Sequence, residues 1–530
     1  MVLGCLAILV MVPLQVPRPF AAEETRRELH EADRAIRRAE LEGLERLADE
    51  LARSGDAEGA RAARSRIPVP EDPDGPTRFV AMPGVVPARP AASPTPVEQR
   101  IHVIRSRSAS AFLDLARRAA KADPPRYALS DSCLRAVLDR QPDQPEARRL
   151  LGYVPYQGGW ARPFDIAQFR EGYIDHPVFG WVRADWKPNL ERGELPSPTV
   201  RGQVRWLSVK DADQLREGWD PPWQIPTEHF LILSNVPLAE VISFGRRLEA
   251  FHDLFMAIMA DVQGDLSPLA RRFRDPKAVG EPPGKRHTVY YFSSREVYLD
   301  RLSAKYDREM LDLSLGFYDP PKSSNGRSPA YFFRDPGGQL PITANLYHEV
   351  SHQLLFESAG PNRYTQNAGN YWVFEGLGTY FETTEPQPDG SILVGGRVGR
   401  RMEEAIRSLV DHGRMIPLEI FVHHDESGFA HRDPDIYLRY QEAMALTVFL
   451  MQGRERTYRE GFLDYVRDAY RGRLRARTGR KLPERLGISY ETLEAQLLAF
   501  LRKNRGPDLA TPAEPPRSAP SRSIRTVPRS

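Results

Sequence analysis

The sequence predicts an α+β fold, in which a small mixed sheet precedes a helical half and both follow a helical N-terminal region. Three short segments, residues 228–234 (EHFLILS), 287–292 (HTVYYF) and 329–333 (PAYFF), have the alternating or apolar pattern of strands. Residues 239–261 and nearly everything after Leu340 have helical periodicity. This order of elements favours an α+β domain over alternating βαβ units.

The composition limits the number of domains and the classes of partner that the protein can have. The chain has 530 residues and is 41% hydrophobic, so it can bury a sizeable core in two or three domains. Its 74 basic residues against 71 acidic ones leave a net charge of +3, too small an excess to indicate a nucleic-acid or membrane surface. We therefore expect no nucleic-acid partner. The only two cysteines, Cys5 and Cys133, exclude a disulfide scaffold.

The N-terminus resembles a secretory signal. Residues 2–14 (VLGCLAILVMVPL) are apolar but too few to span a bilayer, and the small residues Ala21 and Ala22 follow as a cleavage site. A buried N-terminal strand is the alternative. We expect residues 1–22 to be a signal peptide, the mature protein to be secreted or periplasmic, and no stable membrane insertion after its removal.

The region before the predicted sheet divides into four parts. Residues 23–66 interleave acids and bases with Leu and Ala, which predicts an amphipathic helix or helical hairpin. Residues 67–100 are proline-rich with little to bury, and are predicted to be an extended linker. Residues 101–157 resemble a tetratricopeptide-type helical unit, with Cys133 in its core. Residues 158–222 predict a small β-containing linker domain.

The remaining chain forms one predicted domain and a tail. Residues 223–504 contain the predicted sheet and helical half. Residues 505–530 are rich in Pro, Ser and Arg and are predicted to be disordered.

A histidine pair marks the candidate site. In YHEVSHQLLFE, His348 and His352 are four residues apart, which on a helix places both imidazoles on one face, within reach of one ion. A helix is expected because Pro341 suits its first turn and Gly360 and Pro361 stop it. Glu349 has the position of a general base that does not itself bind metal.

A catalytic zinc ion needs a third protein ligand. No H-x-x-G-x-x-H extension follows the motif, so a later helix must supply it. WVFEGLGTYFE, residues 372–382, has helical spacing, and Glu375 follows His352 by 23 residues, enough for an antiparallel return. Glu382, seven residues further on the same face, is the alternative, but Gly376 favours close approach at Glu375. We expect one Zn²⁺ held by His348, His352 and Glu375.

At these residues the chain resembles a known group of enzymes. HEVSH followed by WVFEGLGTYFE is similar to the gluzincin, or peptidase MA-like, metallopeptidases, whose second helix commonly reads E-G-x-x-x-Y-x-E. TEHFLILSN and YQEAMALTVFL further resemble a bacterial domain-of-unknown-function family seen mainly in planctomycetes. The resemblance covers roughly residues 223–504. It implies a zincin-like metallopeptidase domain, zinc, and hydrolysis of a peptide or protein substrate.

Two departures from the aminopeptidase branch of that group favour an endopeptidase. That branch has a G-x-M-E-N strand whose Glu holds the free amine of the substrate, whereas the strand here reads SPAYFFRDPGG. Phe374 also stands where the branch has Asn. The same branch has a Tyr that stabilises the oxyanion, and the resemblance places Tyr440, at the start of YQEAMALTVFLM, in that role. Tyr437 is its rival, and a packing role at a helix start is the other interpretation of Tyr440.

Other expectations concern residues near the site. We predict that Ala330 to Phe333 form a sheet edge on which an extended peptide adds as one more strand. His423, His424 and His431 lie in a polar segment, where solvated histidines are commoner than metal ligands. His287, at a strand start, is predicted to be structural.

Two functions follow from these observations. The first is a secreted zinc endopeptidase, with a protein partner docking on its N-terminal helices. The second is a non-catalytic protein-binding scaffold with a relic metallopeptidase domain. The intact H-E-x-x-H with Glu375 favours the first, because a relic has no need to keep the base.

Overall fold

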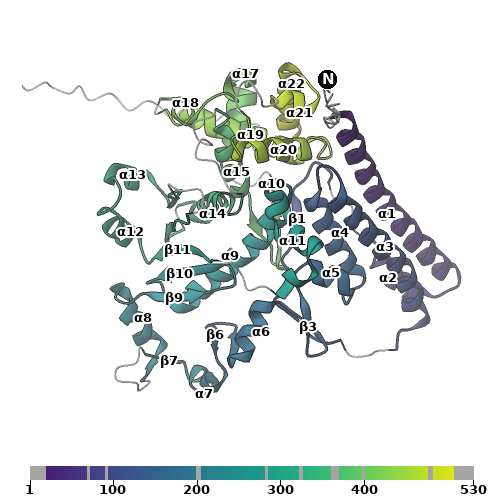
Figure 1. The fold of residues 1–530 in the computed structure, drawn as a ribbon, viewed down its shortest axis with the longest axis horizontal. Helices are drawn as coiled ribbons and strands as arrows, with labels where there is room; N and C mark the ends of the chain where they lie inside the picture. Colours follow the sequence, from purple (N-terminus) through teal and green to yellow (C-terminus); the bar gives the residue numbers. More distant parts are fainter. Residues whose placement is uncertain are drawn as a thin grey trace, which may run out of the picture.

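The computed structural model describes residues 19–68, 72–89, 93–197, 205–280, 285–321, 326–338, 340–359, 369–396, 400–431, 433–474 and 481–505. The apolar run of the predicted signal peptide, with Cys5, and the predicted tail after residue 505 lie outside the described residues. The fold is α+β, as predicted: helices dominate, and the strands form small sheets (Figure 1).

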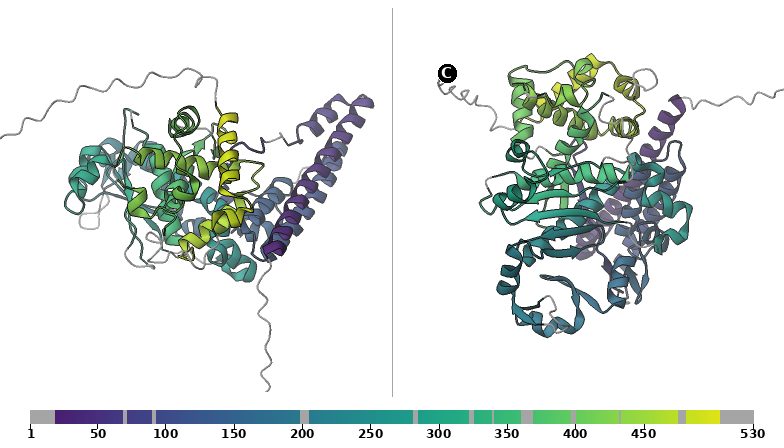
Figure 2. Two further views of the ribbon diagram at one scale, coloured as in Figure 1. Left: turned by 90° about the horizontal axis from the view of Figure 1, so that it is seen from above. Right: turned by 60° about the vertical axis from the view of Figure 1, so that its left-hand side comes forward.

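The N-terminal region is helical, as its charge pattern predicts. Its helices are α1 (Pro19–Arg53), α2 (Ala57–Arg64), α3 (Pro96–Lys121), α4 (Tyr127–Arg140) and α5 (Pro145–Leu150). Helices α1, α2 and α3 lie side by side and project from the rest of the molecule (Figures 1 and 2). Their far end has a small core of its own, formed by residues such as Leu44, Leu47 and Ile101. Cys133 is fully buried on α4, as expected.

Short strands and helices connect this region to the main sheet. They are β2 (Val85–Val86), β3 (Val154–Tyr156), β4 (Gly159–Ala161), α6 (Pro163–Arg170), β5 (Tyr173–His176), β6 (Gly180–Arg183), α7 (Lys187–Glu191), β7 (Glu194–Pro196), β8 (Trp206–Ser208) and α8 (Val209–Glu217). Strands β5 and β6 form one antiparallel pair, and β7 and β8 form another. Their buried side chains share a small core with Leu238 and Ile242.

The main sheet has five strands. In spatial order they are β12 (Phe317–Tyr318), β13 (Ala330–Phe333), β11 (His287–Phe292), β10 (Phe230–Ser234) and β9 (Trp223–Pro226). Strands β10, β11 and β13 are parallel, and the two outer strands are antiparallel to their neighbours. The three predicted strands are all present, and residues 287–292 are a strand over their whole predicted length.

Helices cover both faces of this sheet. Helices α9 (Leu238–Ile258) and α14 (Ile342–Ser358) pack on one face, and α12 (Arg295–Leu302) and α13 (Arg308–Leu313) pack on the other. Helices α10 (Ala260–Gln263) and α11 (Pro268–Arg274) follow α9 and lie against α4. Phe332 packs in the large core that contains residues of α9 and α14, whereas its neighbours Tyr331 and Phe333 pack with α12 and α13. This alternation follows from the period of two along a strand.

Strand β13 is not a sheet edge, so the prediction for Ala330 to Phe333 is wrong. It pairs with β11 on one side and with β12 on the other, and all four of its residues are buried. The covering strand β12 has only two residues and lies in LSLGFYDPP, a segment too short to show strand periodicity. The outer position next to β13 therefore belongs to Phe317 and Tyr318.

The C-terminal half is helical apart from two strands. Its elements are α15 (Trp372–Glu382), β14 (Glu385–Pro386), β15 (Ser391–Val394), α16 (Arg400–Ile406), α17 (Leu418–Phe421), α18 (Glu426–Phe429), α19 (Ile436–Gln452), α20 (Arg459–Tyr470), α21 (Leu482–Leu486) and α22 (Tyr490–Lys503). Helix α19 is buried from Glu442 to Gln452 and lies at the centre of this half.

The proline-rich region contributes to the core, contrary to the prediction that it has little to bury. Residues Thr77–Val80 form strand β1, which pairs with β15 more than 300 residues later in the sequence. Phe79 belongs to the main hydrophobic core. The stretch is extended, as predicted, but it joins the N-terminal region to the C-terminal half.

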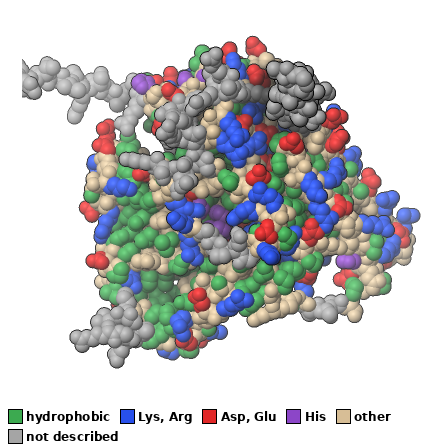
Figure 3. Space-filling view, in the orientation of Figure 1, with side chains coloured by type: hydrophobic (Ala, Val, Ile, Leu, Met, Phe, Trp, Pro, Cys, Tyr) green, Lys and Arg blue, Asp and Glu red, His purple; other side chains and the backbone are tan. Residues whose placement is uncertain are grey.

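Charged side chains of both signs share one face of the molecule (Figure 3). On the face shown in Figure 3, acidic and basic side chains alternate over the helical regions, in line with the small net charge. Within the described ranges, every helix is too short or too polar to cross a lipid bilayer.

Candidate functional site

Helix α14 carries the histidine pair. Its apolar residues Leu346, Val350 and Leu354 recur at helical spacing and are buried in the main core, so the helix is held against the sheet. His348 and His352 lie on another side of the helix and face α15. The helix ends at Ser358, before the predicted stop signal.

Two glycines set the position of α15. A Cβ atom on Gly378 would lie 2.6 Å from Nε2 of His348, so only glycine lets α15 lie against that imidazole. A Cβ atom on Gly376 would lie 2.4 Å from the Thr447 hydroxyl oxygen on α19. Gly376 therefore allows α19 to lie close to α15, and Gly378 allows α15 to lie close to His348.

The structure brings His348, His352 and Glu375 together. Oε2 of Glu375 lies 3.3 Å from Nε2 of His348 and 4.0 Å from Nε2 of His352. One ligand atom from each residue lies within 4.8 Å of the others. The two imidazole rings are 4.8 Å apart at their centres and inclined by 77°.

This geometry fits a single zinc ion. Ligand atoms about 2.0–2.2 Å from a tetrahedral ion lie roughly 3.3 Å from one another, and two imidazoles that share it have ring centres about 5 Å apart. The observed distances require only small side-chain movements. Two imidazoles and one carboxylate are also a common protein ligand set for catalytic zinc.

Glu382 lies behind His348 rather than among the three converging groups. Its Oε1 is 2.9 Å from Nδ1 of His348, and its Oε2 accepts a 2.8 Å hydrogen bond from Nε of Arg401. A carboxylate on Nδ1 orients the ring and leaves Nε2 directed at Glu375. Glu382 thus occupies the position expected for a partner of a metal-ligating histidine.

The buried charges of the site favour a cation. Burial alone would lower the pKa of His348, but hydrogen bonds to Glu375 and Glu382 raise it to about 10. Burial would raise the pKa of Glu375, yet the hydrogen bond from His348 and the charge of His352 lower it to about 2. Burial lowers the pKa of His352 to about 4. A divalent ion would neutralise the carboxylates and leave both imidazoles neutral.

Glu349 is held beside this cluster by the main sheet. Its Oε2 accepts a 2.9 Å hydrogen bond from the amide of Tyr318 in the outer strand β12. Its Oε1 makes no hydrogen bond to the described residues. Burial raises the pKa of Glu349 to about 7, a value suited to accepting and releasing a proton near neutral pH.

Two tyrosines flank Glu375. Tyr440, on α19, is half-buried; the charge of Glu375, followed by burial, raises its pKa, and a hydrogen bond to Glu375 adds to the effect. Tyr437, its rival, is 73% exposed. Tyr371 also hydrogen-bonds Glu375, and burial raises its pKa. The sequence analysis missed Tyr371, although its spacing of four residues before Glu375 could have identified it.

The remaining histidines of interest do not join this cluster. Among the described residues, His423, His424 and His431 belong to no group of three metal-binding side chains. His423 is exposed and its Nδ1 lies 2.7 Å from the carbonyl oxygen of Glu419. His287 is buried, with Nδ1 2.6 Å from Oε2 of Glu357, which is consistent with the structural role predicted for it.

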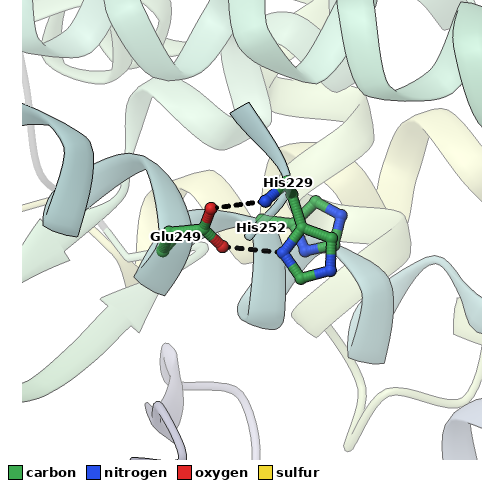
Figure 4. Close-up of side chains that lie close together, drawn as sticks. All are labelled: His229, Glu249 and His252. Carbon is green, nitrogen blue, oxygen red and sulfur yellow. Dashed lines mark hydrogen bonds and ion pairs between the residues drawn. The ribbon is translucent and has the colours of Figure 1, made fainter. Parts of the chain in front are cut away.

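A second cluster, His229, Glu249 and His252, was not predicted. Nδ1 of His229 lies 2.7 Å from Oε2 of Glu249, and the amide of His229 donates to Oε1 (Figure 4). The two imidazoles stack, with ring centres 3.7 Å apart and an angle of 19°. Two imidazoles that bind one ion have their ring centres about 5 Å apart, which is wider than the separation observed here. The cluster therefore has the geometry of a histidine–carboxylate pair with a stacked neighbour.

A comparison with known protein families covers the part of the chain that contains the site. No curated protein matches this chain. Residues 342–472 match the model of a family described as a protein of unknown function, DUF1570. The matched range begins with α14 and extends through α15 and α19, so it contains His348, Glu349, His352, Glu375 and Tyr440.

Proposed function

We propose that this protein is a zinc-dependent peptidase that hydrolyses peptide bonds with an activated water molecule. The observation that carries the proposal is the convergence of His348, His352 and Glu375 from two helices, with Glu349 beside them. The carboxylate of Glu382 on Nδ1 of His348 adds support, because metal-ligating histidines commonly donate their other ring N–H to a carboxylate.

A bound zinc ion would polarise the carbonyl of the scissile bond and lower the pKa of water to about 7. His348, His352 and Glu375 would hold the ion. Glu349 takes a proton from the attacking water through Oε1 and later passes it to the leaving amine. The amide of Tyr318 keeps the other oxygen of Glu349 in place during both transfers.

Tyr440 is the proposed donor to the oxyanion. Its hydroxyl lies against Glu375, and its pKa is raised, so it stays protonated and able to donate at neutral pH. Tyr371 approaches the same carboxylate from the start of α15 and is assigned to positioning Glu375.

The sequence favours an endopeptidase, because the acid that anchors the free amine in aminopeptidases has no counterpart in residues 328–338. The apolar run at residues 2–14 favours export, so we propose a secreted or periplasmic enzyme. The projecting helices α1 to α3 are the proposed docking surface for a protein partner (Figure 2).

Metal content and cleavage of a denatured protein mixture test this proposal. We expect one zinc ion per chain in the wild type and in Glu349→Gln, and cleavage that falls by about 10²- to 10⁴-fold in the variant. Glu403→Gln, which changes an exposed glutamate on α16, should cleave as the wild type does.

Each part of the proposal can fail separately. Full activity of zinc-loaded Glu349→Gln would reject Glu349 as the base. A wild-type protein that binds no zinc and cleaves nothing would favour the alternative, a protein-binding scaffold with a relic metallopeptidase domain.

A further inference from the structure

A cavity of about 350 Å³ lies away from the zinc ligands, between α9, the first turn of α14 and the ends of β11 and β13. Small-molecule sites commonly have volumes of about 300–1,000 Å³. None of His348, His352 and Glu375 lines this cavity. Its wall combines an apolar part, with Phe244, Phe332 and Leu346, and a polar part of both charges.

The cavity has an unpaired cation on one side. Arg247 is exposed on α9 and forms no ion pair with the described residues. Its guanidinium lies 6.0 Å from the centre of the Phe244 ring, so it stands at the border of the apolar wall. A planar guanidinium in this position suits a carboxylate.

The first turn of α14 lies on the same wall, through Ile342 and Thr343. This 17-residue helix begins after Pro341, which provides no side-chain cap. The amide of Thr343 has no hydrogen-bond partner among the described residues. The first turn of a helix carries partial positive charge and free amides, which attract an anion.

A tyrosine of β11, Tyr291, also lines the cavity. Tyr291 is only 8% exposed, and its hydroxyl forms no hydrogen bond with the described residues. The charges that act on this hydroxyl are those of Arg247, Glu240 and Arg334, all of which line the cavity. A ligand oxygen in the cavity could accept a hydrogen bond from this hydroxyl.

Two carboxylates complete the wall. Oε1 of Glu240 accepts a 2.6 Å hydrogen bond from Arg334, and Oδ2 of Asp335 accepts a 2.7 Å hydrogen bond from the amide of Leu340. The second oxygen of each has no hydrogen bond to the described residues. These oxygens can accept from an ammonium group, so the cavity offers partners for both ends of a zwitterion.

We propose that this cavity binds a free amino acid with an apolar side chain. Its carboxylate would meet Arg247, the Tyr291 hydroxyl and the first turn of α14, and its ammonium group would meet Glu240 and Asp335. The side chain would contact Phe244, Phe332 and Leu346. The site goes beyond the proposed peptidase function and does not depend on it.

Calorimetric titration of the full chain with L-leucine tests the site. We expect one binding event per chain with a Kd at or below about 1 mM. N-acetyl-L-leucine, which lacks the ammonium group, and L-leucinamide, which lacks the carboxylate, should each bind about 10-fold more weakly or worse. No heat of binding up to about 10 mM leucine, or equal binding of either analogue, would overturn the proposal.

Substitutions locate the ligand. Arg247→Gln should weaken leucine binding about 10-fold or more, and Tyr291→Phe should weaken it about 3- to 10-fold. Arg246→Gln is the matched control, because Arg246 is the adjacent exposed arginine on α9 but bonds Asp175 and the carbonyl of His176, outside the cavity. Unchanged affinity in Arg247→Gln and Tyr291→Phe would reject the site. Glu349→Gln should keep the wild-type Kd for leucine. Leucine binding therefore tests this site independently of the peptidase proposal.

Discussion

At the residue scale, the contacts of His348 explain why two glutamates on α15 occupy different positions around one imidazole. Glu375 is buried and Glu382 is half-buried on the same helix, but Glu375 meets Nε2 of His348 and Glu382 meets Nδ1. When one ring nitrogen donates its N–H to a carboxylate, only the other ring nitrogen can coordinate a metal ion.

Replacing Glu382 should therefore loosen the metal without removing a ligand. Glu382→Gln keeps a hydrogen-bonding group but removes the charge behind the imidazole, so zinc affinity should fall about 10- to 100-fold. Competition with a chelator of known affinity measures this change, and Glu403→Gln is the control. An unchanged zinc affinity would show that Glu382 does not orient His348.

Tyr440 should affect the rate rather than the metal. Tyr440→Phe removes the hydroxyl beside Glu375, and we expect kcat to fall about 10²-fold or more, with zinc still bound and KM little changed. The control is Tyr437→Phe, which alters an exposed tyrosine one turn earlier on the same helix. A kcat equal to the wild-type value would leave Tyr440 with a packing role only.

At the element scale, α15 is held between α14 and α19 by small residues on its two sides. Gly378 admits the ring of His348, and Gly376 admits Thr447 of α19. Helix α19 in turn contains a fully buried acid, Glu442, whose Oε2 accepts a 3.0 Å hydrogen bond from the amide of Ile416. Its Oε1 is buried without a hydrogen-bond partner among the described residues.

Glu442 should make stability depend on pH. Burial raises its pKa to about 8 from 4.5, so between these values the folded protein binds more protons than the unfolded chain. The free energy of unfolding contributed by this group is therefore highest at low pH and is lost as pH rises toward 8.

Glu442→Gln keeps the acceptor for Ile416 and cannot ionise. We expect it to exceed the wild type in free energy of unfolding by at least about 1 kcal/mol at pH 8, with a smaller difference at pH 5. Denaturant unfolding at the two pH values measures this. A difference that does not grow with pH would show that Glu442 is not the group responsible.

At the scale of the whole molecule, charges buried between the N-terminal and C-terminal helices tie the two regions together. Arg126, just before α4, is 4% exposed and makes two 3.1 Å hydrogen bonds to Asp464 of α20. Its Nε lies 3.4 Å from Glu460, which also lies 2.6 Å from Nε2 of His30 on α1. Strand β1 makes a second connection through its pairing with β15.

Breaking this buried group should destabilise the entire protein. Arg126→Gln removes the buried cation that Asp464 and Glu460 share and leaves them with the more exposed Arg467 and His30. We expect the free energy of unfolding to fall by about 3 kcal/mol. Arg117→Gln is the control, because Arg117 pairs with Glu146 at a more exposed position and should cost less than about 1 kcal/mol. Equal effects of the two substitutions would show that the buried contact does not join the regions.

Much of the fold follows from local patterns. The strands at residues 230–234, 287–292 and 330–333, and the helix that carries His348 and His352, have periodicities that neighbouring residues alone specify. The candidate third ligand could also be selected, because Glu375 lies on a helical segment at a suitable distance in sequence from His352. Roles such as zinc binding and proton transfer remain predictions for the experiments above.

Only the tertiary structure decided how distant segments meet. The sequence by itself determined the α+β class, the helix α14 and the side chains that it presents, because a period of 3.6 or two residues acts over a few turns. It could not show that Phe317 and Tyr318 cover β13, that Thr77–Val80 pair with β15, or that Glu382 lies behind His348. Those contacts join residues from 12 to more than 300 positions apart, and they form because burial and hydrogen bonding are satisfied for the whole chain at once.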